Sequence, residues 1–382
     1  MSKRIAILGS TGSIGTNALE VIAHLGAPYQ AIALSARKNT DLLLEQVRQH
    51  KPACVALADN GSDDAAIAEI RRLGTRIYKG IDGLTEMVQR DDVDLVLAAI
   101  VGAAGLPAVL AAVDAGKTLA LANKEALVVA GSLVMPEARK RNVKVLPVDS
   151  EHSAIFQAIH CGRRDEIKKI ILTASGGPFL GKSKNEIASA TVEQALAHPT
   201  WRMGNKVTID SATLFNKGLE LIEACWLFDI PPSMVQVVVH PESIIHSMVE
   251  FNDGSVIAQL SPPDMRTPIQ YALTYPERAS GISRKMDWSS TFSMNFQPPD
   301  LDRFPGLAIA YEVAERGGTS GAVMNAANEV AVDAFMTGKI RFGRIPEVVR
   351  QTLDRHRVQL HPSLDDLLEA DRWARETAGA NL

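Results

Sequence analysis

The sequence predicts an α/β protein in three parts: an N-terminal parallel sheet, an α+β middle region and a C-terminal α-helical region. Three observations support this prediction. Short aliphatic segments alternate with helical patterns over residues 1–149, as in a parallel sheet that helices cover on both faces. A glycine-rich turn, Gly9–Gly15, separates the first strand from the first helix. Helical periodicity dominates from Leu307 onward. Together these patterns indicate a Rossmann-like N-terminal domain.

Length and composition are those of a globular protein. At roughly 100–200 residues per domain, 382 residues suggest two or three domains. With 46% hydrophobic and 22% charged residues the chain can bury a sizeable core. The net charge of −4 excludes a protein that binds nucleic acid by neutralising phosphates over its whole surface. Three widely spaced cysteines suggest neither a zinc site nor a disulfide framework, which favours a reducing compartment.

One stretch, Leu95–Val113, approaches the ~18–20 apolar residues that a membrane span needs. Gly102, Gly105 and Pro107 interrupt it, so it reads as a strand, a tight loop and a helix. The N-terminus enters an ordered pattern almost at once and lacks the long apolar core of a signal peptide. We therefore expect a cytoplasmic protein that binds neither membrane nor nucleic acid.

Periodicity and turn signals predict the individual elements. In the N-terminal region the expected strands are 4–8, 31–35, 54–58, 95–100, 118–121 and 144–148, and the expected helices are 17–25, 40–50 with Thr40 as N-cap, 65–73, and 107–115 closed by Gly116. The middle region has expected strands at 167–174, 235–239 and 255–260 and a helix from about 212 to 227. The C-terminal helices are expected at 307–316, 322–337, 345–356 and 364–378. The predicted domains are 1–149 and 150–274, a linker 275–302, and a helical domain 303–382.

The glycine-rich turn has the pattern G-x-x-G-x-x-G between a strand and a helix. Glycines let a backbone approach a pyrophosphate, and the helix N-terminus offers free N–H groups to it. The next strand ends at Ser35–Asn39, where an NAD-binding protein usually has a carboxylate. Here two cations, Arg37 and Lys38, stand instead, which favours NADP(H). A turn without a ligand and a solvated basic surface are the alternatives.

Acidic residues follow the last parallel strand and recur on a later helix. In an extended chain Asp149 and Glu151 point the same way, and paired carboxylates suit Mg²⁺ or Mn²⁺. Solvated loop acids are an equal alternative on spacing alone. On the helix after Ser211, Asn216 and Glu220 share a face that Lys217 borders, as needed for a metal and a phosphate together. Glu223 fits the metal as well by spacing, and a surface ion pair is the alternative.

Four further segments carry polar groups. Asn123–Glu125 follows a strand, and is either a site at the sheet edge or a helix N-terminus. The loop that begins at Ser175 suits a phosphate or is a simple turn. The segment 198–204 is a lid or a packed loop. His240 and His246 we expect to be structural.

Motifs spread over nearly the whole chain resemble the 1-deoxy-D-xylulose 5-phosphate reductoisomerase family. They are GSTGSIG at 9–15, AAIVGAAGL at 98–106, LANKEAL at 121–127, LPVDSEHSAIFQ at 146–157, ASGGPF at 174–179, HPTWRMG at 198–204, DSATLFNKGLELIEACWLF at 210–228, HPESIIHSMVEFNDGSV at 240–256 and PDMRTPI at 263–269. The resemblance implies an NADPH- and metal-dependent enzyme of non-mevalonate isoprenoid biosynthesis. It would rearrange and reduce 1-deoxy-D-xylulose 5-phosphate to 2-C-methyl-D-erythritol 4-phosphate by a retro-aldol/aldol route.

The resemblance also implies roles for individual residues. The implied metal ligands are Asp149, Glu151 and Glu220, in preference to Glu223. The implied catalytic residues are Glu151, Lys124 and His198. The implied cofactor contacts are Thr11, Gly12, Ser13, Ile14, Arg37, Lys38, Asn39, Asn123, Glu125, Met203 and Gly204. The implied substrate contacts are Lys124, Ser150, Glu151, Ser175, His198, Trp201, Ser211, Asn216, Lys217 and Glu220. Arg37 departs from the family, which often has glycine there, and would add a contact to the 2′-phosphate.

Two other functions compete with this one. A simple NADP-dependent dehydrogenase of a phosphorylated aldehyde needs no carboxylate triad, so its activity would survive chelation. A non-catalytic NADPH-binding sensor would have lost metal or phosphate positions, and those positions are intact here. The resemblance further implies a homodimer and a metal among Mg²⁺, Mn²⁺ and Co²⁺.

Overall fold

The computed structural model describes residues 3–59 and 65–382. By the density of contacts the chain forms two compact units. Unit 1 comprises Met1–Ala126, Val134–Ser153 and Asp264–Arg284, and unit 2 comprises Leu127–Leu133, Ala154–Pro263 and Lys285–Leu382. This division does not test the predicted domain boundaries, which remain a prediction.

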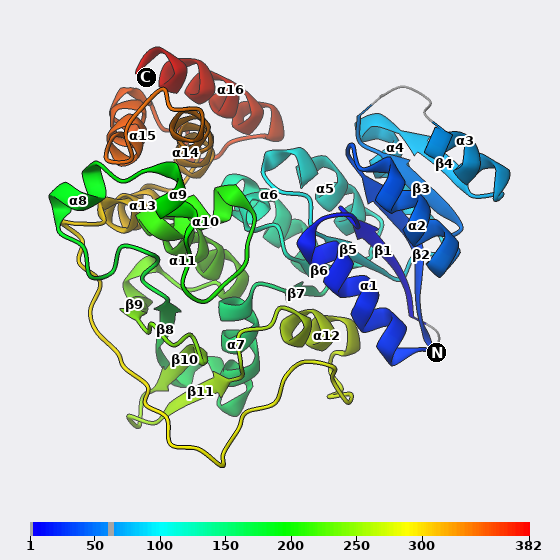
Figure 1. Ribbon diagram of the computed structural model, residues 1–382, viewed down its shortest axis with the longest axis horizontal. Helices are drawn as coiled ribbons and strands as arrows, with labels where there is room; N and C mark the ends of the chain where they lie inside the picture. Colours follow the sequence, from blue (N-terminus) through cyan, green and yellow to red (C-terminus); the bar gives the residue numbers. More distant parts are fainter. Residues whose placement is uncertain (1–2, 60–64) are drawn as a thin grey trace. The chain divides into compact units, whose positions relative to one another are not determined.

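Unit 1 is built on a parallel seven-stranded sheet of order β4-β3-β2-β1-β5-β6-β7 (Figure 1). The strands are β1 (Lys3–Leu8), β2 (Tyr29–Ala36), β3 (Cys54–Leu57), β4 (Arg76–Lys79), β5 (Leu95–Ala98), β6 (Thr118–Leu121) and β7 (Val145–Pro147). The aliphatic stretch Ile5–Leu8 of the central strand is fully buried, as expected for a sheet covered on both faces. The predicted Rossmann-like fold is confirmed.

Helices flank both faces of this sheet (Figure 1). They are α1 (Ser13–Leu25), α2 (Thr40–His50), α3 (Ala65–Arg72), α4 (Gly80–Gln89), α5 (Leu106–Asp114), the start of α6 (Lys124–Lys140), the first turn of α7 (Ser150–Ala158) and α12 (Arg266–Thr274). Although α12 lies far along the sequence, it packs against α1. Strand β1 lies between β2 and β5 in the sheet, and the glycine-rich turn follows its carboxyl end.

Five elements that lie wholly or partly in unit 1 are missing from the prediction: β4, α4, α6, α7 and α12. Strand β4 has four residues with exposed cations at both ends, so it shows no apolar run. Thr40 as N-cap is wrong, because α2 begins at Thr40 itself. The cap is Asn39, whose side chain accepts a hydrogen bond from the N–H of Leu42 at 3.2 Å. Both residue types cap helices well, so the choice needs the backbone geometry.

Unit 2 contains a four-stranded mixed sheet of order β11-β10-β8-β9. Its strands are β8 (Ile167–Ala174), β9 (Val235–Val239), β10 (Ile245–Phe251) and β11 (Val256–Leu260). Strand β10 is antiparallel to both of its neighbours and was not predicted, because His246 and Ser247 break its aliphatic pattern. A turn at 252–254 joins β10 to β11.

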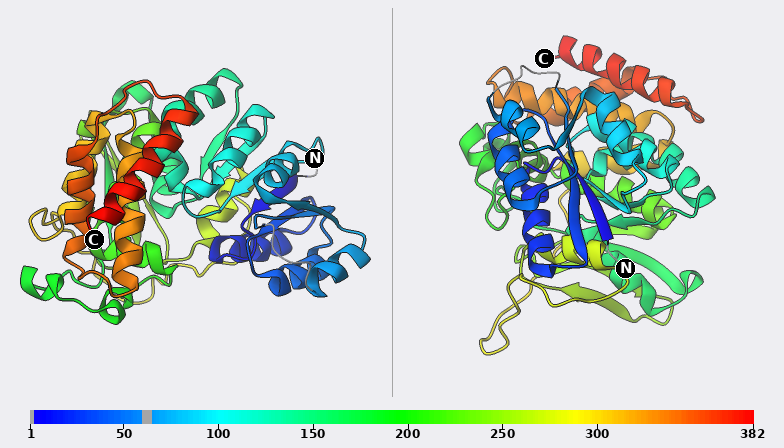
Figure 2. Two further views of the ribbon diagram at one scale, coloured as in Figure 1. Left: turned by 90° about the horizontal axis from the view of Figure 1, so that it is seen from above. Right: turned by 90° about the vertical axis from the view of Figure 1, so that its right-hand side faces the viewer.

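The helices of unit 2 are α8 (Lys184–Ala188), α9 (Val192–Leu196), α10 (Asn205–Thr213), α11 (Phe215–Phe228), α13 (Pro305–Arg316), α14 (Ser320–Met336), α15 (Arg344–Arg355) and α16 (Leu364–Ala380). Figure 2 shows the last three side by side, and α14 contacts both α15 and α16. The helix predicted from about 212 to 227 is confirmed as α11 from residue 215 onward, but residues 212 and 213 belong to the separate helix α10. Leu214, which has a left-handed φ of 61°, separates the two helices. Directly before it, the Thr213 hydroxyl hydrogen-bonds to the carbonyls of Ile209 and Asp210, in place of a continued helical pattern.

In the part of the chain that the structure describes, no helix combines the length and the apolar character of a membrane span. The linker expected at 275–302 is mostly irregular backbone, with one isolated bridge from Gln297 to Val239 of β9. The three cysteines are free thiols. Burial raises the pKa of Cys54 to about 11, so this thiol stays protonated at neutral pH.

Candidate active site

The glycine-rich turn is held in one shape by buried polar contacts. The Ser10 hydroxyl contacts Gln46 Oε1 at 2.7 Å, and Gln46 Nε2 donates to the Ser10 carbonyl at 2.8 Å. The Ser35 hydroxyl accepts the Gly9 N–H at 2.9 Å. A Cβ on Gly15 would lie 2.3 Å from the Gly9 carbonyl oxygen, so only glycine allows α1 to start this close to β1. Gly12 is the N-cap of α1. The predicted contacts Thr11, Gly12, Ser13 and Ile14 thus lie at the helix N-terminus.

The end of β2 carries the predicted cations on the surface. Strand β2 stops at Ala36, and Arg37 and Lys38 are exposed directly after it. Arg37 Nε lies 3.4 Å from Asp59 Oδ1 across 22 residues of chain. Sequence reasoning missed Asp59. The pair is open to solvent, so a phosphate can compete for the guanidinium at small cost.

The start of α6 brings three predicted residues to the carboxyl end of β6. Asn123 caps this helix: its Oδ1 accepts the Ala126 N–H at 3.2 Å, and its Nδ2 donates to the Gly102 carbonyl at 3.0 Å. The structural role weighed for Asn123 is therefore present. Lys124 Nζ lies 2.6 Å from Asp149 Oδ2, and both side chains are largely buried. Glu125 is also buried in the first turn.

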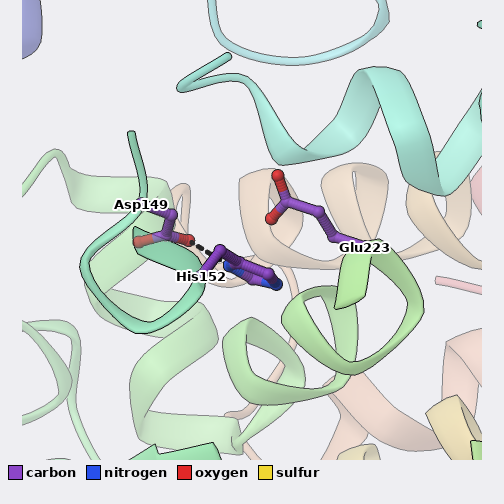
Figure 3. Close-up of side chains that lie close together, drawn as sticks. All are labelled: Asp149, His152 and Glu223. Atoms are coloured by element: carbon purple, nitrogen blue, oxygen red, sulfur yellow. Dashed lines mark ion pairs between the residues drawn. The ribbon is translucent and has the colours of Figure 1, made fainter. Parts of the chain in front are cut away.

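The backbone around the carboxylate pair differs from the prediction. The premise of an extended chain is wrong, because α7 begins at Ser150 and Glu151 lies in its first turn. Asp149 precedes the helix, and its Oδ1 accepts the Ser150 N–H at 3.0 Å. The Ser150 hydroxyl donates to Glu151. His152 Nδ1 lies 3.8 Å from Asp149 Oδ2, the ion pair dashed in Figure 3, and sequence reasoning did not single out His152.

Helix α11 groups the second predicted set on one face. Asn216 Nδ2 donates to Glu220 Oε1 at 2.5 Å, and Lys217 Nζ pairs with Glu220 Oε2. The Lys217 and Glu220 side chains are 4% and 1% exposed, so the alternative of a surface ion pair is wrong. Glu223 lies one turn further along and is also fully buried. A buried cation beside a buried carboxylate can serve a phosphate and a metal ion at once.

The loop after β8 and the start of the predicted lid meet at one hydrogen bond. Ser175 Oγ lies 2.9 Å from His198 Nε2. His198 Nδ1 accepts the N–H groups of Thr200 at 3.2 Å and Trp201 at 2.9 Å, so Nε2 carries the proton and donates to Ser175. Ser175 also accepts the Gly177 N–H at 3.2 Å, which leaves its own proton to donate to an anion. Burial lowers the pKa of His198, which matches the neutral ring.

The rest of the 198–204 segment is irregular and leads into α10. The Trp201 ring lies 6.1 Å from the His246 ring on β10. Met203 is partly exposed, and Gly204 is the N-cap of α10. Ser211, on the last turns of α10, approaches the Ser175 loop: a Cβ on Gly177 would lie 2.8 Å from the Ser211 carbonyl oxygen. The segment is therefore anchored at both ends and irregular between them.

His240 is structural, as expected. It is fully buried, accepts the N–H groups of Ile244 and Ile245 at Nε2, and contacts the Asn295 carbonyl at 2.9 Å through Nδ1. Sequence reasoning also missed two side chains that contact the buried Asp210, namely Lys206 on α10 and Asn328 on α14. A lysine and an asparagine inside helices carry no sequence signal for a site.

Comparisons with known proteins agree along the whole chain. Sequence models of the 1-deoxy-D-xylulose 5-phosphate reductoisomerase family match residues 5–131, and models of its C-terminal domains match 145–228 and 260–377. The reductoisomerase of Desulfosudis oleivorans is 52% identical over 382 residues and covers 100% of each chain.

Solved structures of this family are equally similar. The Zymomonas mobilis reductoisomerase in complex with NADPH has a TM-score of 0.92 at 43% identity, covering 100% of this chain and 99% of that chain. A reductoisomerase in complex with NADPH, fosmidomycin and magnesium has a TM-score of 0.94 at 41% identity, covering 99% of this chain and 98% of that chain. The predicted family resemblance is confirmed: the chain belongs to the 1-deoxy-D-xylulose 5-phosphate reductoisomerase family.

Proposed function

We propose that the protein converts 1-deoxy-D-xylulose 5-phosphate to 2-C-methyl-D-erythritol 4-phosphate, with NADPH as the reductant and a divalent metal ion as the Lewis acid. Membership of the family carries the reaction. The observation that supports the site is the Asn216–Lys217–Glu220 cluster, because Lys217 and Glu220 are charged and yet almost fully buried.

Asp149, Glu151 and Glu220 are proposed to hold the metal. Asp149 and Glu151 belong to unit 1 and Glu220 to unit 2, and each side chain offers a carboxylate oxygen to an ion. Carboxylate oxygens fit a hard cation such as Mg²⁺ or Mn²⁺. His152 and Glu223, both drawn in Figure 3, are the second choice as ligands because imidazole suits softer metals. The ion would stabilise negative charge on the substrate oxygens.

The substrate phosphate is proposed to bind to Ser175, Ser211, Asn216 and Lys217. The Ser175 proton is free to donate, and Lys217 supplies the compensating charge in a buried setting. Binding energy from this distant group would position the reacting carbons. Ser150 is proposed as a further substrate contact.

NADPH is proposed to bind with its pyrophosphate on the glycine-rich turn and its 2′-phosphate near Arg37 and Lys38. Asn39, Asn123 and Glu125, with Met203 and Gly204 of the lid, are the proposed remaining contacts. The fixed turn and the exposed pair of cations support this placement. Arg37 would exchange Asp59 for the phosphate.

Lys124, Glu151 and His198 are proposed to act directly on the substrate. Lys124, whose Nζ pairs with Asp149, would donate a hydrogen bond to a substrate oxygen. Glu151 would accept or return a proton during the rearrangement. His198, neutral and tethered to Ser175, would close with Trp201 over the substrate and exclude water.

The loss of NADPH absorbance with 1-deoxy-D-xylulose 5-phosphate tests this function, once with Mn²⁺ and once after chelation. We expect turnover with the metal and none after chelation. Turnover that survives chelation would instead identify the simple dehydrogenase. No turnover at all would reject the activity, and binding of NADPH alone would then support the sensor.

We further propose that the protein is a homodimer in the cytoplasm. Strand β11 is an edge of the four-stranded sheet, and the linker exposes Trp288, Phe292 and Phe296. Exposed strands and aromatic groups of this kind are common at subunit interfaces. Sedimentation velocity at micromolar concentration should give the mass of a dimer, and a single species of 41.2 kDa would contradict it.

A further inference from the structure

A carboxylate is buried one residue before the proposed phosphate ligand Ser211. Asp210 is 1% exposed, and each of its oxygens has one partner. Lys206 Nζ, one turn earlier on α10, lies 2.8 Å from Oδ2. Asn328 Nδ2, from α14, donates to Oδ1 at 2.7 Å. The contact between Asn328 and Asp210 joins residues 118 positions apart, so it ties α10 to the C-terminal helices.

The chemistry of this contact fixes the orientation of the Asn328 amide. If the amide were flipped, its oxygen would lie 2.7 Å from a carboxylate oxygen of Asp210, and the two oxygens would repel each other. The amide oxygen that remains is buried and accepts no hydrogen bond from the described residues. Such an orphaned acceptor is unfavourable, and Asn325 on the same helix has one too, so the hydrogen bond to Asp210 is what distinguishes Asn328. An apolar side chain here would remove the orphan but leave Asp210 without its donor.

Helix α10 connects three parts of the proposed site. It begins directly after the lid segment, with Gly204 as its N-cap. Near its end, the backbone of Ser211 packs against Gly177 in the Ser175 loop. It then stops at Leu214, and α11 with Lys217 follows. A shift of α10 would therefore displace the lid hinge and the phosphate ligands together.

We propose that Asn328 is a positioning residue for substrate binding: through Asp210 it holds α10 so that Ser211 and the Ser175 loop present one phosphate site. The proposal rests on the proposed function of this site. Among the described residues, the hydrogen bond of the Asn328 side chain goes to Asp210, which we do not assign to the substrate. Because well-placed binding groups are sensitive to displacements of about 1 Å, the loss of the donor should weaken substrate binding by at least about tenfold.

The test compares Asn328→Leu with Asn325→Leu in the full-length protein. Asn325 is the matched control: it is fully buried on the same helix, but its amide donates within α14, to Glu329 at 3.1 Å. We expect Asn328→Leu to raise the KM for the sugar phosphate by at least about tenfold while the KM for NADPH stays unchanged. Asn325→Leu should lower thermal stability and change neither KM.

A second pair of variants separates positioning from a general loss of stability. Asn328→Asp places two carboxylates together, and the double variant Asp210→Asn with Asn328→Asp restores one amide against one carboxylate. The double variant should recover a lower KM than Asn328→Asp alone. If folded Asn328→Leu kept the wild-type KM, or if both leucine variants raised it equally, the inference would be overturned.

Inorganic phosphate gives a readout that does not depend on turnover. It should raise the unfolding temperature of the wild type and do so much less for Asn328→Leu. Equal stabilisation of the two proteins would overturn the inference. Absence of wild-type turnover, with this difference in stabilisation intact, would reject the proposed reaction and leave the role of Asn328 standing.

Discussion

Replacing Gly15 with alanine perturbs the glycine-rich turn at its tightest point. The new Cβ would lie 2.3 Å from the Gly9 carbonyl oxygen and 2.4 Å from Ser10 Cα. Both atoms belong to the backbone, so no side chain can rotate away. Ordinary contact begins at 3.4 Å, so α1 would have to move by about 1 Å from the turn.

Two effects follow from this displacement. Overpacking of a tight contact lowers the free energy of unfolding by about 1–3 kcal/mol. The N–H groups of the helix N-terminus also move away from the proposed pyrophosphate position. Since 1.4 kcal/mol is a factor of ten, we expect the dissociation constant of NADPH to rise about tenfold to a hundredfold.

Fluorescence titration of NADPH and thermal unfolding measure the two effects separately. Gly181→Ala is the matched control, because its Cβ would have nothing within 4 Å and its φ is ordinary. That variant should bind NADPH and unfold as the wild type does. Wild-type NADPH affinity in folded Gly15→Ala would refute the reasoning about the turn.

Three further predictions concern the carboxylate cluster, the lid and the C-terminal helices. Glu220→Gln should weaken Mn²⁺ binding at least about tenfold in a direct titration, because it removes a proposed ligand charge; unchanged affinity would contradict this. Burial lowers the pKa of His198 below 6.5 in the folded protein. As the pH falls, the unfolded segment therefore binds a proton at a higher pH than the folded segment does. The lid should therefore lose stability, and kcat/KM should fall, as the pH is lowered below 6.5; an acid limb identical in His198→Asn would oppose this. Arg375→Met, which breaks partly buried pairs with carboxylates on α14 and α16, should cost about 1–2 kcal/mol in denaturant unfolding, whereas the exposed Arg372→Met should cost almost nothing.

Much of the fold could be predicted because its signals are local. The buried strand Ile170–Leu172 lies in a run of aliphatic residues, and the C-terminal helices show sustained periodicity. Strand β10 was not predicted because its polar residues His246 and Ser247 are buried only through long-range pairing with β8 and β11. The separation of α10 from α11 at Leu214 was not predicted, because periodicity does not reveal that the Thr213 hydroxyl hydrogen-bonds to the preceding turn.

The site was predictable where a motif is continuous in sequence. Asn216, Lys217 and Glu220 share one helical face, and the structure brings them together as the spacing predicts. The pairing of Asp149 with Lys124 depends on two neighbouring strands of the sheet, so it has no local signal. The same holds for Asn328, whose role depends on packing between distant helices.

The methyl signal of the reaction product tests the central claim most directly. Rearrangement followed by reduction places the methyl group on a carbon without hydrogen, so its proton resonance should be a singlet. Simple reduction of the ketone would place it beside a CH group, and the resonance would be a doublet. A singlet formed in step with NADPH oxidation is the predicted result, and a doublet would contradict the assignment of a reductoisomerase.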